Sequence, residues 1–316
     1  MFDLPALEAA ADLVHAVFPP TPLIAWPLLS ERAGCVVVVK HENHTPVGAF
    51  KIRGGITYFD RLARERPGTR GVISATRGNH GQSLAFAGAR AGIPVTIIVP
   101  CGNSTEKNAA MRAQGARLIE HGADFDAARI EAMCIATAKG LEFTPSFHPD
   151  LVIGVATYAL ELFRAGPPPD ALYVPIGLGS GICGCILARD LLGLSTEIIG
   201  VQSTEADSYA RSFAAGQVVT TETALTLADG MATRIPDAAA LEIIRRGASR
   251  IVTVTDAAVA EAIRAYWTDT HNLAEGAGAA PLAALLQDKA QMRGKRVALI
   301  LCGGNIDLAL FRSWIR

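Results

Sequence analysis

The stretch KHENHTPVGAFKIRGG, residues 40–55, places Lys51 between two predicted elements of secondary structure. The β-branched residues 36–39 before it predict a buried strand, and the amphipathic segment 52–64 after it predicts a helix. Because burial disfavours the ammonium form, a lysine at such a junction can act as a nucleophile or a base. A solvated surface lysine is the alternative interpretation.

Strand-like and helix-like segments alternate along most of the chain, which is typical of parallel sheets covered by helices on both faces. Further strands are predicted at 71–75, 94–100, 116–121, 171–176, 197–202, 250–254 and 296–302. Further helices are predicted within 1–17 and at 79–90, 104–114, 125–139, 180–192, 256–267 and 281–291.

These elements predict an α/β fold with two lobes, each a twisted, mostly parallel open sheet flanked by helices. The segment AGPPPD at 165–170 interrupts the pattern between two sets of βα units. We predict that residues 71–148 form a small domain. Residues 1–70 and 149–316 then form a large domain that holds most of the ligand site.

Composition favours small-molecule chemistry. The chain has 316 residues, is 50% hydrophobic and has a formal net charge of -1, so it has no electrostatic signature for nucleic acid or an acidic membrane. Asp3 and Glu8 lie where a basic leader would stand, and no apolar run is long enough to span a bilayer. The six cysteines show no zinc spacing. We therefore expect a soluble, cytoplasmic protein with free thiols.

The segment SATRGNHGQ, residues 74–82, runs from an apolar strand into an Ala-rich helix. The unpaired backbone amides and the dipole at a helix start favour a bound carboxylate or phosphate. An ordinary helix cap, made by Asn79 with Gly78 in the preceding loop, is the alternative.

The segment YVPIGLGSGICG, residues 173–184, is rich in glycine where a strand meets a helix. Backbone without a Cβ can approach a phosphate closely, so this is a candidate phosphate cradle. Its glycines also fit GxGxxG, but a dinucleotide site needs an acidic residue about twenty positions on. Val201 and Gln202 end that strand instead, which disfavours nicotinamide binding. Tight helix packing is the remaining alternative.

The segment VALILCGGNIDL, residues 297–308, is an apolar strand that stops at Cys302 before two glycines. Ligands of open α/β sheets bind at the carboxyl ends of strands, so Cys302 is a candidate to face a ligand. Simple packing of a buried thiol is the alternative.

Taken together, these segments resemble the fold type II pyridoxal-phosphate enzymes, of the tryptophan synthase β-like fold. Within them the chain is similar to the threonine/serine dehydratase and serine racemase family over nearly its whole length. AFKIRG matches the family's S-F-K-x-R-G, which implies that Lys51 is the Schiff-base lysine, with Phe50 beside the cofactor ring. Asn79 would bond the ring hydroxyl, and Cys302 would face the pyridine nitrogen.

The same resemblance implies a loop for the cofactor phosphate, residues that line the ring and a turn that holds the substrate carboxylate. The loop consists of Gly177, Leu178, Gly179, Ser180 and Gly181, in which Leu178 and Ser180 interrupt the usual glycine run. The ring-lining residues are Gly230 and Glu275. The turn consists of Thr76, Arg77, Gly78, Asn79 and His80.

Two departures from the family change the expectation. Arg77 stands where racemising members carry a serine base, and a guanidinium stays charged, so we expect little racemisation. Arg77 either recognises a second substrate carboxylate or faces solvent. Gln202, Ala206 and Ser208 fall on the family's cation site and provide no carboxylate, so we expect no metal and no divalent requirement. A monovalent ion on carbonyl oxygens remains an alternative.

The implied function is conversion of a β-hydroxy amino acid, threonine or serine by default, to a 2-oxo acid and ammonia. A neutral thiol at Cys302 makes the ring a weaker electron sink, which favours elimination over transamination. Alternatives are dehydration of 3-hydroxyaspartate or phenylserine, and β-replacement of the cysteine synthase type, whose TSGNT-like loop differs from TRGNH here. A catalytically silent amino-acid or cofactor binding protein is the non-enzymatic alternative, against which Lys51 argues. The family also implies a homodimer.

Overall fold

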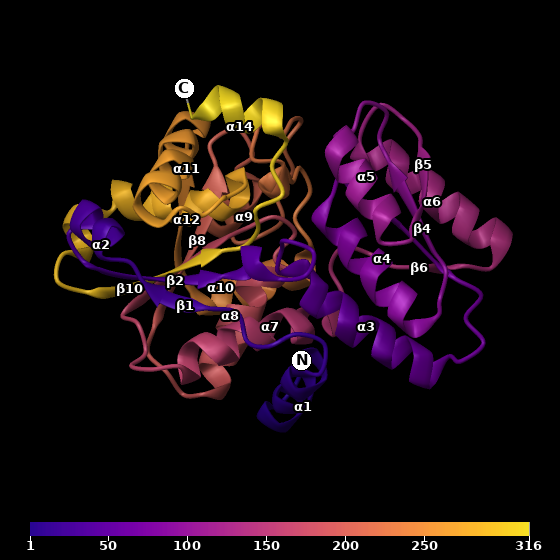
Figure 1. Ribbon diagram of the computed structural model, residues 1–316, viewed down its shortest axis with the longest axis horizontal. Coiled ribbons are helices and arrows are strands. Elements are labelled where there is room, and N and C mark those ends of the chain that lie inside the picture. Colours follow the sequence, from indigo (N-terminus) through magenta and orange to yellow (C-terminus); the bar gives the residue numbers. More distant parts are fainter. Residues whose placement is uncertain (316) are drawn as a thin grey trace.

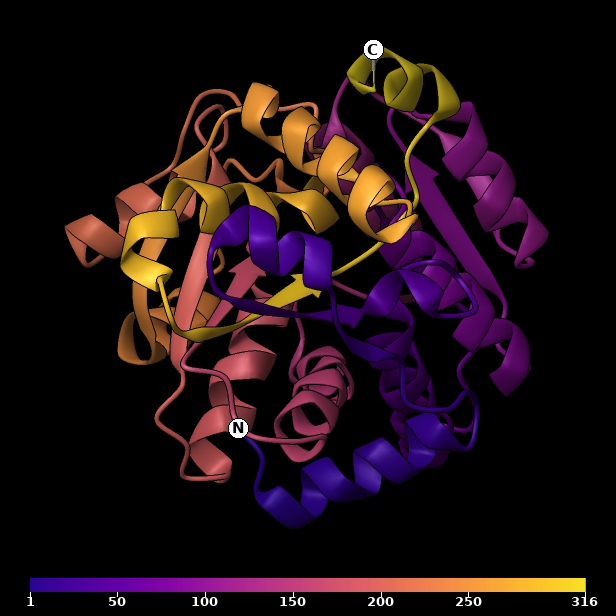
Figure 2. The ribbon, with the colours of Figure 1, turned by 60° about the vertical axis from the view of Figure 1, so that its left-hand side comes forward.

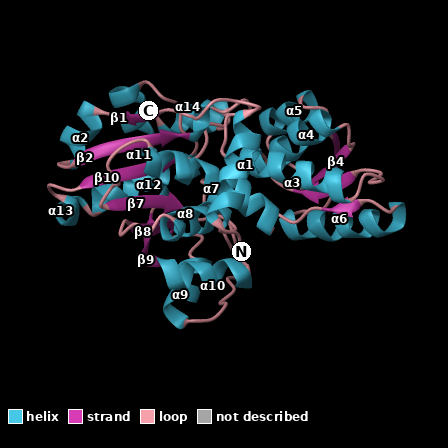
Figure 3. Ribbon diagram, turned by 90° about the horizontal axis from the view of Figure 1, so that it is seen from below, coloured by secondary structure: helices cyan, strands magenta, loops and turns pink. Residues whose placement is uncertain are grey.

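The computed structural model describes residues 1–315, so Arg316, the last residue of the predicted large domain, lies outside the described part. Figures 1 and 3 show two lobes, each with its own sheet. The larger sheet has the order β1-β2-β10-β7-β8-β9, and only its edge strand β1 runs antiparallel to its neighbour. Its strands are β1 (Leu23–Ala25), β2 (Val36–His41), β7 (Ala171–Pro175), β8 (Glu197–Ser203), β9 (Ala248–Val254) and β10 (Arg296–Leu301).

The smaller sheet has the order β5-β4-β3-β6 and is parallel throughout. Its strands are β3 (Val72–Ala75), β4 (Val95–Val99), β5 (Arg117–Glu120) and β6 (Glu142–Phe143). The predicted α/β fold with two mostly parallel sheets is therefore confirmed. The residue limits given above for the two domains stay a prediction.

Helices cover both faces of the larger sheet. Figure 1 shows α11 (Asp256–Thr270) and α12 (Gly276–Gln287) on one side and α7 (Pro149–Arg164) and α8 (Ser180–Leu191) on the other. The remaining helices of this lobe are α1 (Leu4–His15), α2 (Pro27–Ala33), α9 (Ser208–Ala215), α10 (Ala238–Gly247), α13 (Lys289–Met292) and α14 (Leu308–Trp314), with the 3-10 turns η1 (Glu42–His44) and η2 (Asp229–Met231).

The smaller sheet also separates two apolar layers, because successive side chains of a strand point to opposite faces. Ile97 of β4 packs with Leu84 and Met111 under α4 (Asn79–Ala91) and α5 (Thr105–Ala113). Ile98, the next residue, packs with Ala128 and Ala132 of α6 (Phe125–Lys139). The strand is buried on both faces, which explains its continuous apolar sequence.

Glycines allow helix α3 (Lys51–Glu65) to approach its two neighbours closely. A Cβ at Gly54 would lie 2.7 Å from the Leu151 carbonyl of α7, and one at Gly55 would clash with Ser83 of α4. On α7, a Cβ at Gly154 would clash with the Arg53 carbonyl of α3. These positions therefore fix α3 between α4 and α7, at the junction of the two lobes.

Several helices differ from the sequence prediction: α2, α9, α10 and α14 were not predicted, and neither was the longer helix α7. Helix α7 has no predicted counterpart, because its residues are apolar on several faces, as expected of a helix buried between other helices. Helix α12 was predicted to start at Pro281, but it begins at Gly276 and carries Pro281 inside. The prediction placed Pro281 at the first helical position, where proline is favoured, but the five small residues before it are also helical, and Gly276 packs closely against Ala228. Among residues 1–315, no helix has the length and hydropathy needed to cross a membrane.

Candidate active site

A cavity of about 620 Å³ opens between residues of the two lobes. It lies where the carboxyl ends of β3, β7 and β10 meet, as expected for an open α/β sheet. The residues predicted to contact the cofactor or the substrate all line this cavity: Phe50, Lys51, Thr76, Arg77, Gly78, Asn79, His80, Gly177, Leu178, Gly179, Ser180, Gly181, Gly230, Glu275 and Cys302. Their individual roles remain proposals.

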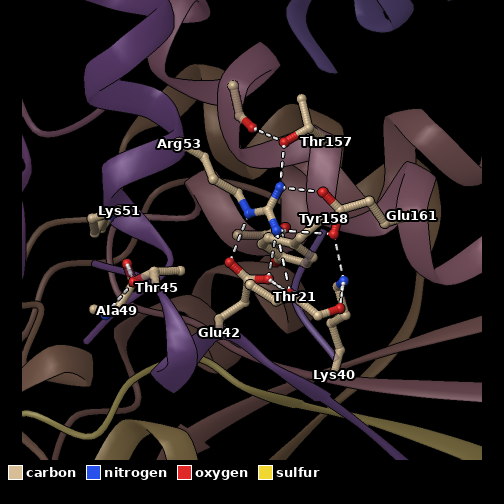
Figure 4. Close-up of polar contacts among 12 residues, drawn as sticks. Thr21, Lys40, Glu42, Thr45, Ala49, Lys51, Arg53, Thr157, Tyr158 and Glu161 are labelled. Atoms are coloured by element: carbon tan, nitrogen blue, oxygen red, sulfur yellow. Dashed lines mark hydrogen bonds and ion pairs between the residues drawn. The ribbon is translucent and has the colours of Figure 1, made fainter. Parts of the chain in front are cut away.

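Lys51 is the first residue of α3, directly after a closed turn. Thr45 Oγ1 donates to the Ala49 carbonyl and accepts from the Ala49 amide, both at 2.9 Å, which holds that turn (Figure 4). The Lys51 side chain is partly buried, and its Nζ donates to Ser180 Oγ at 2.8 Å. Burial disfavours the ammonium ion and lowers the pKa of Lys51 to about 8, although nearby Cys302 opposes the shift. A free amine is therefore accessible near neutral pH.

A buried charged network fixes the helix that carries Lys51 (Figure 4). The Arg53 guanidinium is fully buried and donates to Glu42 at 2.7 and 2.9 Å and to Glu161 at 2.6 and 2.9 Å. Thr157 Oγ1 accepts from it at 2.9 Å, and Lys40 forms an ion pair with Glu161. Burial opposes the charge of Arg53, but the two carboxylates outweigh burial and raise its pKa. The network thereby ties α3 to β2, η1 and α7.

The glycine loop between β7 and α8 is a backbone cradle. Gly179 has a φ of 97°, which favours glycine, and a Cβ at Gly177 would clash with the Gly230 carbonyl. Ser180 begins α8, so its first-turn amides have no acceptor within the helix and the positive end of the dipole faces the cavity. This arrangement suits a phosphate.

Asn79 does not cap α4, so the helix-cap interpretation is wrong. Gly78 is the capping residue, with an extended φ of 176°, and Asn79 is already helical. The Asn79 amide instead donates to Glu275 Oε1 at 2.7 Å, and its Oδ1 accepts from Asn305 Nδ2 at 2.8 Å. Asn305 also donates to the Val47 carbonyl at 2.9 Å. Two residues of the large lobe thus orient an amide on the small lobe.

Glu275 and Cys302 are buried groups whose neutral forms are favoured. Burial raises the pKa of Glu275 to about 7, against the opposing influence of Lys107. Among residues 1–315, Glu275 Oε2 has no hydrogen-bond partner. Burial, together with nearby Glu275, raises the pKa of the Cys302 thiol well above its usual value. The Cys302 carbonyl accepts from the Phe50 amide at 2.9 Å, which joins the β10 end to the lysine turn.

The turn before α4 combines one exposed cation with buried polar groups. Thr76 Oγ1 accepts from the Gly78 amide at 3.1 Å, and Arg77 is exposed at the cavity. Burial and nearby Lys51 lower the pKa of His80 to about 3, so its ring is neutral. Within the described residues, His80 Nε2 has no hydrogen-bond partner.

The sequence did not indicate contacts that cross the cavity between the lobes. Lys107 of α5 forms an ion pair with Asp229 of η2, which precedes Gly230. Ser104 Oγ donates to Asp307 Oδ1 at 2.5 Å, and Glu106 accepts from the Leu308 amide at 3.0 Å, so the start of α14 contacts α5 (Figure 2). These charged residues read as surface residues in the sequence. Asn305 is the exception, because a polar residue just after the end of a buried strand indicates a contact at the ligand site.

These residues fit pyridoxal phosphate. The cradle at 177–181 offers first-turn amides of α8 that have no acceptor within the helix, which suits a phosphate, and close packing of Gly177 on the Gly230 carbonyl holds the loop in place. Lys51 offers an amine with a lowered pKa next to that cradle. Glu275 presents an unpaired buried oxygen, as judged over residues 1–315, beside Asn79.

Comparisons with known proteins agree with this fit. A family model described as "Pyridoxal-phosphate dependent enzyme" matches residues 16–303. The chain is 34% identical to an L-threonine ammonia-lyase of Thermotoga maritima over 309 residues, which cover 98% of this chain and 77% of that protein. It is 32% identical to an L-threo-3-hydroxyaspartate ammonia-lyase of a Pseudomonas species over 311 residues, covering 97% and 96%.

Solved structures agree as well. The structure of the processed form of threonine deaminase isoform 2 from Solanum lycopersicum superposes with a TM-score of 0.90 at 27% identity, covering 99% of this chain and 93% of that one. The family match spans well over half of the chain, and both sequence relatives cover nearly all of it. The chain therefore belongs to the pyridoxal-phosphate-dependent enzymes and, among them, to the ammonia-lyase family.

Proposed function

We propose that this enzyme eliminates the β-hydroxyl group of a β-hydroxy amino acid and releases a 2-oxo acid and ammonia. Threonine or serine is the default substrate. One observation carries the proposal: Lys51 Nζ lies 2.8 Å from Ser180 Oγ, at the start of α8 and beside the glycine cradle. Such an enzyme needs an amine that binds the cofactor covalently and accepts a proton, and it needs a phosphate site close to that amine. Lys51 and the glycine cradle lie close enough together to provide them.

Lys51 acts as the base for the α-hydrogen. Pyridoxal phosphate, when bound, supplies the electron sink that acidifies this hydrogen. The lowered pKa of Lys51, about 8, provides a free amine that can accept the proton near neutral pH. Ser180 Oγ accepts a hydrogen bond from Nζ and so orients the amine within the cavity.

The first turn of α4 binds the substrate carboxylate. The amides that begin a helix have no acceptor within it, and the helix dipole favours an anion there. Thr76 uses its hydroxyl to hold the Gly78 amide, which fixes the turn before these donors. Because the ring of His80 is neutral, the backbone amides and the helix dipole supply the attraction for the carboxylate here.

Cys302 favours elimination over transamination. Its pKa is raised by burial, so the thiol is neutral and cannot stabilise a positive charge on the ring nitrogen as a carboxylate would. The electron sink is correspondingly weaker, and loss of a β-hydroxyl group is favoured over longer-lived carbanion chemistry.

A screen of 2-oxo acid release tests the proposal. Threonine, serine, 3-hydroxyaspartate and phenylserine are each offered in threo and erythro forms where these exist, and the oxo acid is trapped by a coupled dehydrogenase or a hydrazine reagent. We expect release from at least one of them. No release from any, together with thioether formation when an O-activated serine and a thiol are supplied, would establish β-replacement instead.

Arg77 favours 3-hydroxyaspartate as a second candidate substrate. Its guanidinium is exposed at the cavity beside the turn proposed to bind the α-carboxylate, and a guanidinium can bind a second carboxylate in bidentate fashion. The 32% identity to an L-threo-3-hydroxyaspartate ammonia-lyase supports this candidate. In the same screen, Arg77→Gln should lower kcat/KM for 3-hydroxyaspartate far more than for threonine. An equal fall for both substrates would exclude the role.

Arg77 also leads us to propose that racemisation is slow. A guanidinium stays protonated and cannot serve as a second base opposite Lys51. Chiral chromatography of the serine that remains during turnover tests this proposal. Formation of the other enantiomer at a rate comparable to that of oxo acid release would contradict it.

We further propose a homodimer located in the cytoplasm. The dimer is an inference from the family resemblance, and sedimentation velocity measures it directly. The cysteines are free thiols, four buried and two exposed, which suits a reducing compartment.

A further inference from the structure

Helix α9 contacts the glycine loop through Tyr209, which does not line the cavity. Tyr209 of α9 is fully buried, and its hydroxyl donates to the Leu178 carbonyl at 3.0 Å. The same oxygen accepts from the Asp237 amide at 3.0 Å. Asp237 caps the start of α10, and it is the last of the cavity-lining residues in the segment 222–237. One hydroxyl therefore joins the phosphate cradle to a second wall of the cavity.

The first turn of α9 is itself held at two points. Gln202 of β8 accepts from the Ala210 amide through Oε1 at 2.8 Å. Ser208 Oγ donates to the Thr233 carbonyl at 2.7 Å, which adds a second link to the cavity wall. Because these contacts anchor α9 to the larger sheet, the Tyr209 hydroxyl has a fixed position relative to β7 and β8.

The contact with Leu178 determines the direction of one amide in the cradle. In a planar trans peptide, the carbonyl oxygen and the amide hydrogen point to opposite sides. The Leu178 carbonyl points to Tyr209, so the Gly179 amide of the same peptide points away from α9. Gly179 has a left-handed φ of 97°, and a Cβ at this position would lie 2.8 Å from the Ala240 side chain, so the position requires glycine.

We propose that Tyr209 is a positioning residue for the cofactor phosphate. It holds the peptide between Leu178 and Gly179 so that the Gly179 amide is presented to the phosphate, and it does so without touching the cofactor or the substrate. The inference concerns cofactor binding, so it holds whichever amino acid the enzyme accepts.

The variant Tyr209→Phe tests the proposal because it keeps the buried ring and removes only the hydroxyl. Loss of this hydroxyl leaves the Leu178 carbonyl and the Asp237 amide without their partner, and we expect the affinity for pyridoxal phosphate to fall roughly tenfold. Holoenzyme is diluted, and the retained cofactor is measured by ultrafiltration and visible absorbance. The 31P resonance of the bound cofactor should shift, and added pyridoxal phosphate should restore kcat.

Tyr173→Phe is the matched control. Tyr173 of β7 is equally buried, and its hydroxyl donates to Asp288 at 2.7 Å, outside the cavity lining. This variant should lower Tm without weakening cofactor retention or shifting the 31P resonance. The proposal is overturned if Tyr209→Phe retains the cofactor as the wild type does, or if both variants release it equally.

Ser208→Ala covers the case in which Tyr209→Phe does not fold, as judged by far-UV circular dichroism. It loosens the first turn of α9 but leaves the Tyr209 hydroxyl present. We expect cofactor affinity to fall by less than in Tyr209→Phe, roughly twofold to threefold. Cofactor affinity and 31P resonance identical to those of the wild type would contradict a positioning function for this turn.

Discussion

Lys51 and Arg53 lie two residues apart on α3, and their surroundings shift the pKa values of the two side chains in opposite directions. Arg53 is buried among Glu42, Glu161 and hydroxyl oxygens, and its pKa is raised. Lys51 contacts the Ser180 hydroxyl, and burial lowers its pKa to about 8. Arg53 stays protonated, so its charge can hold the surrounding elements together at any ordinary pH. The weakly compensated charge of Lys51 can be lost near neutral pH, as its proposed role in the reaction requires.

The carboxylates of the two regions follow the same division. Although burial favours the neutral acid, Arg53 and Lys40 lower the pKa of Glu161 to about 2. Burial raises the pKa of Glu275 at the cavity to about 7, where no described residue pairs with its Oε2. In the arginine network, defined as Arg53, Glu42, Glu161 and Lys40, Arg53 and Glu161 therefore keep their charges near neutral pH. At the cavity, Lys51 and Glu275 have pKa values near neutral pH instead.

Lys51→Ala should have the largest effect. Turnover should fall by several orders of magnitude, and the visible absorbance of covalently bound pyridoxal phosphate should disappear. Lys107 also lines the cavity, but its ion pair with Asp229 and its raised pKa keep its amine protonated. Tm should change little, since Lys51 makes one side-chain hydrogen bond. Lys139→Ala, at an exposed position on α6, is the control and should leave both unchanged. Substantial turnover in Lys51→Ala would show that the Lys51 amine is not needed for the reaction, and the proposed contrast between Lys51 and Arg53 would fail.

Arg53→Met should cause the largest loss of stability. The substitution leaves two carboxylates buried without their main partner, which costs about 3–5 kcal/mol in the free energy of unfolding. Chemical denaturation measures the loss. Arg64→Met breaks an exposed pair with Asp60 and should cost less than about 1 kcal/mol. Equal losses of stability in the two variants would mean that the arginine network stabilises the fold no more than an exposed ion pair does.

Glu275→Gln should change how the stability of the cofactor-free protein depends on pH. The folded-state pKa of Glu275, about 7, lies above its ordinary value of 4.5, so the folded chain holds the proton more tightly. Its contribution to stability is therefore complete below pH 4.5 and is lost as pH rises through 7, on the order of 3 kcal/mol.

In Glu275→Gln this pH-dependent loss should be absent from urea unfolding curves recorded between pH 5 and 8. Glu222→Gln, at an exposed position on the same cavity, should keep the wild-type slope. A slope in Glu275→Gln that matches the wild type would show that Glu275 titrates normally.

Removal of divalent ions should have the smallest effect. The family resemblance places Gln202 and Ser208 at its cation site. Both use their side-chain oxygens in hydrogen bonds, with the Ala210 amide and the Thr233 carbonyl. Neither supplies the charge that Mg²⁺ or Ca²⁺ prefers. We expect EDTA to leave turnover unchanged. If EDTA abolishes activity and Mg²⁺ restores it, the enzyme does require a divalent ion and the prediction is wrong.

The sequence predicted the features that depend on neighbouring residues. The strand before Lys51 and the helix after it follow from apolar periodicity, and the glycine cradle follows from residues that permit a left-handed turn. The contacts of Asn79 with Glu275 and Asn305 did not follow, because its partners are far away in the chain and a capping pattern fits the same letters. Lys107 and Asp229 read as ordinary surface charges until the lobes bring them together.

The glycines where α3 meets its neighbours have a consequence for sequence variation. Gly54, Gly55 and Gly154 lie at backbone-to-backbone contacts that exclude even a methyl group. At these positions the size of a side chain, and not its polarity, therefore decides whether the helices can pack. Even alanine should destabilise the fold there. Natural variation should accordingly accumulate on the exposed faces of helices such as α5 and α6, while the three glycine positions hardly change.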